Sequence, residues 1–136
     1  IILPVDSVCS ESLKSNNKQI QCSINEIPDD MMGLDIGADS VEKFNNIILK
    51  SKTVLWNGPL GVFENKAFEA GTRQIASSLA ECVEMGAQVI IGGGDTAAAL
   101  EYFKLQKKMT HISTGGGASL ELLSGNHLPA ILALEK

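Results

Sequence analysis

The chain has 136 residues and a net charge of -5, with 44% apolar and 20% charged residues. This length suits one compact domain and the composition is typical of a globular protein, so we expect neither two full domains nor extensive disorder. The acidic balance and the lack of a block of Lys and Arg argue against nucleic acid and anionic membranes as partners, and no apolar run is long enough to predict a membrane span.

The first residues suggest two expectations, one about a missing upstream segment and one about the cellular compartment. It begins at Ile1, and residues 1–9 already have the pattern of a buried strand, so we expect that an upstream segment is missing. No basic and then apolar leader with a small-residue cleavage site is present, which favours a cytoplasmic protein.

Residues 15–17 predict a turn into a second strand at 19–24, and the two strands fit a hairpin. We expect reduced, structural thiols, because the cysteines are odd in number and form no CxxC pair. Cys9 and Cys22 approach each other only if their segments pair. The cysteines are Cys9, Cys22 and Cys82.

Helix and strand then alternate along the chain. Asp39 is expected to cap a helix that ends near Lys50, with Glu42 reaching back to it. The further elements expected are strands at 53–56, 88–91 and 110–113, and helices at 66–85, 95–106 and from 118. The predicted class is therefore α/β, with an open, mainly parallel, Rossmann-like sheet that has helices on both faces and is incomplete at its N-terminal side.

Two glycine triplets, at 92–94 and 115–117, each lie between an expected strand and helix. Bare backbone N–H groups at a helix N-terminus suit an anion, and loops that follow parallel strands meet at one edge of the sheet. One triplet alone would indicate a tight turn, but two in matching places favour a phosphate ligand. A P-loop is excluded because no Gly-Lys pair occurs. Gly92, Gly94 and Ala97 fit the dinucleotide fingerprint, but no acidic residue ends the next strand.

Other side chains at this edge suit a nucleotide. Asp95 either caps its helix or holds Mg²⁺ beside a polyphosphate. Asn57 and Val62 lie in a stiff loop that can wall a planar base, and Glu64 offers acceptors to ribose hydroxyls. Trp56 is expected in the core.

Three long motifs in order resemble phosphoglycerate kinase over essentially the whole chain. They are LWNGPLGVFE at 55–64, GGGDT at 92–96 and STGGGASLE at 113–121. Members of this family are two-domain kinases that move a phosphoryl group from 1,3-bisphosphoglycerate to ADP, giving 3-phosphoglycerate and ATP. The resemblance implies that residues 1–136 are the carboxyl-terminal part of the nucleotide-binding domain, and that the N-terminal domain, which binds phosphoglycerate, is absent.

The resemblance also implies the roles of individual residues. Asp95 would serve Mg²⁺, and the backbone N–H groups of Gly94 and Gly117 would be catalytic, stabilising the phosphoryl group in transfer. It implies ADP or ATP with Mg²⁺ as substrate, no tightly bound cofactor and a monomeric parent enzyme. The implied nucleotide-binding residues are Gly33, Leu34, Asn57, Pro59, Val62, Glu64, Gly93, Gly94, Asp95, Thr96, Gly116 and Gly117.

The basic residues do not fit complete catalysis. Arg73, the one arginine, lies inside an expected helix, and Lys104, Lys107 and Lys108 lie at the far end of another. Transfer between two polyanions needs cations, so we expect no turnover by this chain alone. A non-catalytic nucleotide-binding module and a dinucleotide-dependent oxidoreductase stay open as alternatives.

Overall fold

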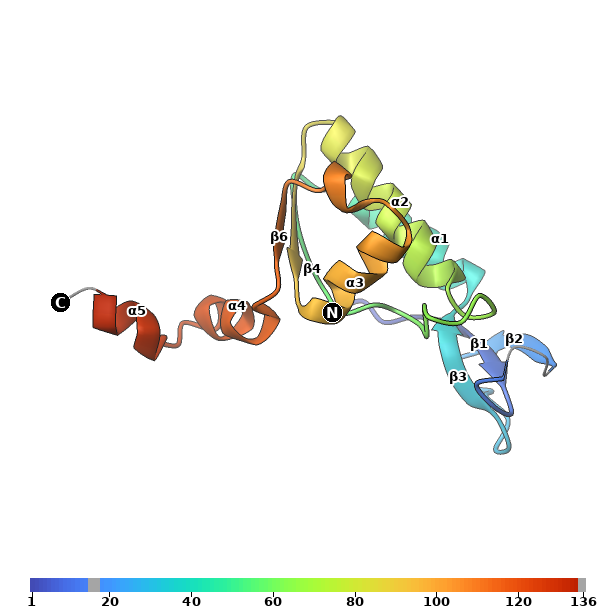
Figure 1. Ribbon diagram of the computed structural model, residues 1–136. Coiled ribbons are helices and arrows are strands. Elements are labelled where there is room, and N and C mark those ends of the chain that lie inside the picture. The colour runs from blue at the N-terminus through green and yellow to red at the C-terminus, as the bar shows by residue number, and fades with distance from the viewer. Residues whose placement is uncertain (15–17, 135–136) are drawn as a thin grey trace.

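Two three-stranded sheets and the helices around them make up the fold (Figure 1). The computed structural model describes residues 1–14 and 18–134, so the turn expected at 15–17 lies outside the described residues. The strands are β1 (Asp6–Ser10), β2 (Gln19–Ser23), β3 (Met32–Ile36), β4 (Thr53–Asn57), β5 (Gln88–Gly92) and β6 (His111–Ser113). The helices are α1 (Ala38–Ile48), α2 (Ala70–Glu84), α3 (Gly94–Tyr102), α4 (Gly116–Leu123) and α5 (Pro129–Leu134), with a 3-10 turn at Gln106–Lys108.

The first sheet is antiparallel, in the order β2-β1-β3. The hairpin of β1 and β2 is confirmed, but β3 was not expected from its sequence, in which Gly33 interrupts a short apolar run. The buried strand expected from residue 1 is wrong at its start. Pairing of β1 with both neighbours begins only at Asp6 and Ser7, and Ile1 and Leu3 are exposed.

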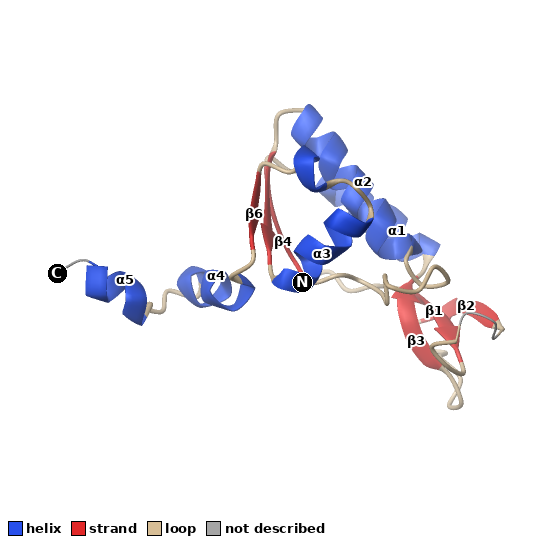
Figure 2. Ribbon diagram, in the orientation of Figure 1, coloured by secondary structure: helices blue, strands red, loops and turns tan. Residues whose placement is uncertain are grey.

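The second sheet is parallel, in the order β4-β5-β6, with α2 and α3 as the crossovers (Figure 2). This confirms the α/β class and the parallel strands. Both crossover helices contact β5 and lie on the same side of the sheet in Figure 1, over the fully buried Val89 and Ile91. Leu55 on the opposite face is 38% exposed, so the second helical layer expected from the sequence is incomplete in the described residues.

Helix α1 begins on a carboxylate from the first sheet. Its N-cap is Gly37, so the expected cap by Asp39 is wrong. The carboxylate of Asp6 instead accepts the backbone N–H groups of Asp39 at 3.1 Å and Ser40 at 2.8 Å, together with the Ser40 hydroxyl. Burial tends to raise the pKa of Asp6, but hydrogen bonds from Ser40, Asp39 and Gln21 outweigh it and lower the pKa below its usual value.

Helix α2 begins in the same way on Asp35 of β3. The Asp35 carboxylate accepts the backbone N–H of Gly71 at 2.7 Å and that of Ile36 at 2.9 Å. The helix starts at Ala70, later than expected, because a turn precedes it in which the N–H of Phe68 donates to the Asn65 carbonyl at 2.8 Å. Burial raises the pKa of Asp35 to about 6, against the lowering effect of its two hydrogen bonds.

The remaining helices differ from expectation at their ends. Helix α3 stops at Tyr102, short of residue 106, and Lys104 beyond it has a positive φ of 60°. Helix α4 starts two residues early, at Gly116, and α4 and α5 extend away from the sheets in Figure 1. Among the described residues, no helix has the length and apolar character needed to cross a bilayer.

Substitutions can test whether Asp6, and not Asp39 as expected from the sequence, caps α1. Asp6→Ala removes the acceptor for the buried N–H of Ser40 and the partly buried N–H of Asp39, so the free energy of unfolding should fall by about 2 to 3 kcal/mol. Asp39→Ala removes an exposed carboxylate that makes no cap and should cost less than about 0.5 kcal/mol. Urea unfolding at neutral pH measures both, and equal losses would contradict the assignment.

Candidate functional site

The carboxyl ends of the three parallel strands lie side by side. Asn57, Gly92 and Ser113 are in register, and the N–H of Gly93 donates to the Ser113 carbonyl at 3.0 Å. The expectation that the glycine-rich loops meet at one edge of the sheet is therefore confirmed. We call this edge the rim; it consists of Asn57, residues 92–96 and residues 113–117.

The two triplets are packed so closely at the rim that side chains do not fit between them. A Cβ on Gly116 would lie 2.6 Å from Asn57 Oδ1 and 2.7 Å from Gly93 Cα. Gly93 has a φ of 94°, which also favours glycine. This packing brings together the N-termini of α3 and α4, whose first N–H groups have no acceptor within their own helix.

Gly94 and Gly117, the two expected catalytic positions, are open to approach. Both are exposed, and a Cβ on either would meet no atom within 4 Å. Space for a ligand thus lies directly against the backbone at the start of α3 and α4.

Asp95 lies exposed in the first turn of α3, and its neighbour Thr96 is fully buried. The N-cap of α3 is Gly93, with no side-chain cap hydrogen bond, so the alternative that Asp95 merely caps its helix is wrong. The Thr96 hydroxyl accepts the N–H of Gly58 at 2.7 Å and so fixes the loop after β4. The Thr96 side chain therefore has a structural role between α3 and this loop.

Four of the other residues expected to bind the nucleotide line a hollow of about 530 Å³ beside β3, apart from the rim. We call this hollow the β3 pocket. It lies at the other end of the loop that leaves the rim at Asn57, where the N–H of Val62 donates to the Leu34 carbonyl at 2.9 Å. Glu64 is exposed and is not among the lining residues. The expected residues that line the pocket are Gly33, Leu34, Pro59 and Val62.

The sequence reasoning missed Asp35, Ile24 and Ile27 as further lining residues of the β3 pocket. Asp35 is the most informative of them, since its carboxylate also starts α2. The signal in the sequence was an acidic residue inside an otherwise apolar run at 34–36. Without knowledge of β3, that run does not indicate a buried acid.

Two of the basic residues discussed above, Arg73 and Lys108, have partners away from the rim. Arg73 pairs with Glu69 at 2.5 Å, and its guanidinium lies 4.5 Å from the centre of the Phe103 ring. Lys108 pairs with Glu84 at 2.9 Å. These contacts agree with the expectation that the two side chains do not serve the rim.

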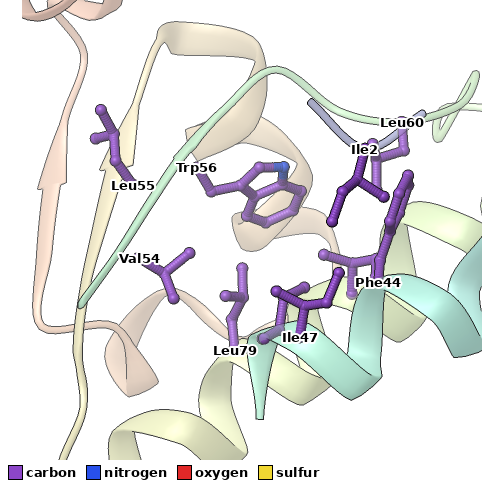
Figure 3. A pocket seen from close by; sticks show the side chains of 10 residues that line it. Ile2, Phe44, Ile47, Val54, Leu55, Trp56, Leu60 and Leu79 are labelled. Atoms are coloured by element: carbon purple, nitrogen blue, oxygen red, sulfur yellow. The ribbon is translucent and has the colours of Figure 1, made fainter. Parts of the chain in front are cut away.

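Another hollow, of about 280 Å³, lies between α1, α2 and β4 and is lined only by apolar residues (Figure 3). Trp56 and Leu79 point into it together with Phe44 and Val54. Trp56 is 7% exposed and belongs to the core, as expected. A lining without charged groups does not suit a nucleotide.

Comparison with known proteins identifies the family. A family model described as phosphoglycerate kinase matches residues 1–126. The chain belongs to the phosphoglycerate kinase family. Its sequence is 52% identical to phosphoglycerate kinase from Acaryochloris marina (strain MBIC 11017) over all 136 residues, and 50% identical to the cytosolic enzyme of Nicotiana tabacum over 99% of the chain.

Solved structures of phosphoglycerate kinases share the fold. The enzyme from Coxiella burnetii matches 96% of the chain with a TM-score of 0.87 and 39% identity, and that from Pyrococcus horikoshii OT3 matches 97% with a TM-score of 0.80 and 30% identity. The chain covers 34% of each of the two curated relatives, and 33% and 32% of the two solved chains. It therefore spans about a third of the length of the phosphoglycerate kinases that it matches.

The glycine packing at the rim predicts opposite effects for two neighbouring substitutions. Gly116→Ala forces backbone apart at Gly93 and should lower the free energy of unfolding by about 2 kcal/mol. Gly117→Ala meets open space and improves helix propensity, so stability should hold or rise by up to about 1 kcal/mol. Urea denaturation of both variants checks this, and a loss from Gly117→Ala as large as that from Gly116→Ala would refute it.

The raised pKa of Asp35 makes stability depend on pH in a defined direction. The pKa of Asp35 is 3.8 in the unfolded chain and about 6 in the folded chain. At a pH between these two values, Asp35 therefore keeps its proton in the folded chain and releases it in the unfolded chain. The contribution of Asp35 to the free energy of unfolding is therefore complete below pH 3.8. About 2 kcal/mol of it is lost as the pH rises to about 6 and above. Asp35→Asn does not titrate and should remove this change.

The measurement is the free energy of unfolding at pH values from about 4 to 7, taken as the difference between the parent chain and Asp35→Asn. Taking the difference cancels the other carboxylates, Asp6 included, whose lowered pKa gives the opposite slope. A constant difference over this range would show that Asp35 is ionised normally in the folded chain.

Proposed function

We propose that residues 1–136 form the carboxyl-terminal part of the nucleotide-binding domain of a phosphoglycerate kinase and supply the nucleotide side of its active site. The observation that carries this proposal is the rim. Two helix N-termini open onto free space at Gly94 and Gly117, and the exposed Asp95, which follows Gly94 in the first turn of α3, is not used as a cap. Family membership supports the same role.

The rim fits the phosphates of ADP or ATP. In the proposed complex, the N–H groups of Gly94 and Gly117 donate to phosphoryl oxygens, while Gly93 and Gly116 let the two loops approach closely enough to act together. The Thr96 N–H lies in the same first turn of α3. Asp95 offers the oxygen ligand that Mg²⁺ prefers, and the ion, bound with the nucleotide, neutralises phosphate charge.

The β3 pocket fits the nucleoside. Gly33, Leu34, Pro59 and Val62 offer it a partly apolar wall suited to adenine. Asn57 lies where the loop leaves the rim. We assign it to contact the part of the nucleotide that lies between the phosphates and the base. Glu64, exposed beyond the pocket, is assigned to the ribose hydroxyls.

The proposed reaction is the reversible glycolytic transfer between a carboxyl group and a nucleotide. An oxygen of the ADP β-phosphate attacks the acyl phosphate of 1,3-bisphosphoglycerate, the bond from phosphorus to the carboxyl oxygen breaks, and 3-phosphoglycerate and ATP result. Such transfer depends on positioning and charge stabilisation, which the backbone donors of Gly94 and Gly117 supply from one side. We assign phosphoglycerate binding to a separate N-terminal domain and expect no turnover by this chain alone.

We further propose a monomeric parent enzyme that acts in the cytoplasm, without a tightly bound cofactor. The compartment is supported by the tobacco relative, which is named cytosolic. A relative from Volvox carteri, 49% identical, is named chloroplastic, so fractionation of the source cells is the deciding measurement.

Calorimetric titration tests the nucleotide site. MgADP should bind saturably and NAD should give no heat, because the chain lacks the acidic residue that a dinucleotide fold places on the ribose. Asp95→Asn should weaken MgADP binding about tenfold, equal to about 1.4 kcal/mol. Asp39→Asn, the same change at an exposed first-turn position of α1, is the matched control and should leave the affinity unchanged.

Three outcomes would count against the proposal. Absence of MgADP binding by a chain with a native far-UV spectrum would remove the half-site, whereas an unfolded spectrum would locate the fault in folding. Saturable NAD binding would favour the oxidoreductase alternative. Equal weakening by Asp95→Asn and Asp39→Asn would show a general charge effect in place of a specific ligand.

A further inference from the structure

Two thiols of the antiparallel sheet lie in contact. Cys9 of β1 and Cys22 of β2 place their sulfur atoms 3.3 Å apart, although both are free cysteines. The two strands are hydrogen-bonded neighbours, so the condition for this approach, pairing of their segments, is met. Gly33 of the β3 pocket pairs with Cys9 from the other side, and Asp6 and Ser7 of the same strand β1 also line that pocket.

The register places these cysteines diagonally. Cys9 lies opposite Ile20, and Cys22 lies opposite Ser7. Diagonal neighbours usually hold their Cβ atoms farther apart than the ~3.5–4.5 Å of a disulfide. The side chains have turned toward each other, which brings the sulfurs to 3.3 Å across the diagonal. A disulfide between diagonal neighbours departs from relaxed geometry and is therefore more readily reduced than a relaxed one.

The two thiols differ in exposure. Cys9 is fully buried and its thiol lies 3.8 Å from the Ser7 carbonyl, whereas Cys22 is partly exposed. A reagent in solution therefore reaches Cys22 first and meets Cys9 only through it. Cys82 is buried on α2, where its thiol donates to the Ile48 carbonyl at 3.1 Å, and serves as an internal reference.

We propose that Cys9 and Cys22 form a reversible dithiol site, which a small disulfide oxidant converts to an intramolecular disulfide. The Cys22 thiolate attacks one sulfur of the reagent, which releases one thiol and leaves a mixed disulfide. The Cys9 sulfur then attacks the Cys22 sulfur, which joins the two cysteines and releases the second thiol. The protein loses two hydrogen atoms, that is, two protons and two electrons, and the reagent gains them.

The surroundings select the reagent. The hydrogen bond with Cys9, burial, and the carboxylates of Glu26 and Asp6 raise the pKa of Cys22 above its usual value. The same carboxylates repel anionic disulfides. A neutral reagent at mildly alkaline pH, where more of the thiol is ionised, is therefore the appropriate probe.

The test uses the full chain in mixtures of 2-hydroxyethyl disulfide and 2-mercaptoethanol, in native buffer and in urea, trapped with iodoacetamide and read by intact mass. The native chain should become lighter by two hydrogen atoms, with Cys82 as its one alkylated cysteine after unfolding. At a fixed concentration of 2-mercaptoethanol, the concentration of 2-hydroxyethyl disulfide that oxidises half of the protein should be about tenfold lower in native buffer than in urea, where the two cysteines of the unfolded chain meet only by chance.

Two serine variants separate the two steps, and an alanine variant of Cys82 is the control. Cys9→Ser should stop at the mixed disulfide on Cys22, Cys22→Ser should leave the buried Cys9 unreacted, and Cys82→Ala should behave like the parent, each with an unchanged far-UV spectrum. The proposal is overturned if the folded parent accumulates the mixed disulfide, if Cys82 or a second chain enters the bond, or if native buffer gives no advantage over urea.

Discussion

Two buried aspartates on one small sheet anchor the starts of the two longest helices, α1 and α2. Asp6 on β1 receives the first N–H groups of α1, and Asp35 on β3 receives that of Gly71 in α2. Each carboxylate satisfies donors that a helix cannot satisfy itself and lies at the positive end of the helix dipole. Asp6 gathers donors from three residues and its pKa falls, whereas Asp35 has two backbone donors and its pKa rises because burial prevails.

The loop after β4 joins the two halves of the candidate site, the rim and the β3 pocket. The loop after β4 is held at one end by Thr96 and at the other by the Leu34 carbonyl, one residue before Asp35. The rim and the β3 pocket are therefore joined by a segment fixed at both ends. In the proposed complex this spacing would set the distance between phosphates and base, and Asp35 would affect the nucleoside part of the site, because it lines the β3 pocket and also holds the start of α2.

The rim offers backbone donors and one carboxylate, while Arg73 and Lys108 are paired elsewhere. Such a surface is suited to holding a nucleotide with its metal ion more than to neutralising a second polyanion. This agrees with a chain that spans about a third of the phosphoglycerate kinases it matches. The proposed division of labour, with phosphoglycerate held by another domain, follows from that distribution of charge.

The sequence by itself determined the alternation of helix and strand after residue 38, the parallel sheet and the meeting of the two glycine triplets. These features follow from local periodicity and from the rule that parallel strands end on one edge. It also carried the motifs of the family. Helix ends were less well predicted, as at residues 66 and 106, because turns such as Asn65–Phe68 depend on contacts beyond the local pattern.

Only the tertiary structure decided which carboxylates start α1 and α2, that β3 exists, and that Cys9 meets Cys22. The caps join residues 34 and 36 positions apart in the chain, and the thiols meet through a diagonal register. A nearby acid such as Asp39 is the natural choice from sequence, but the packing of α1 against β1 brings Asp6 to the free N–H groups. Contacts of this kind depend on where distant segments come to rest, which local patterns do not encode.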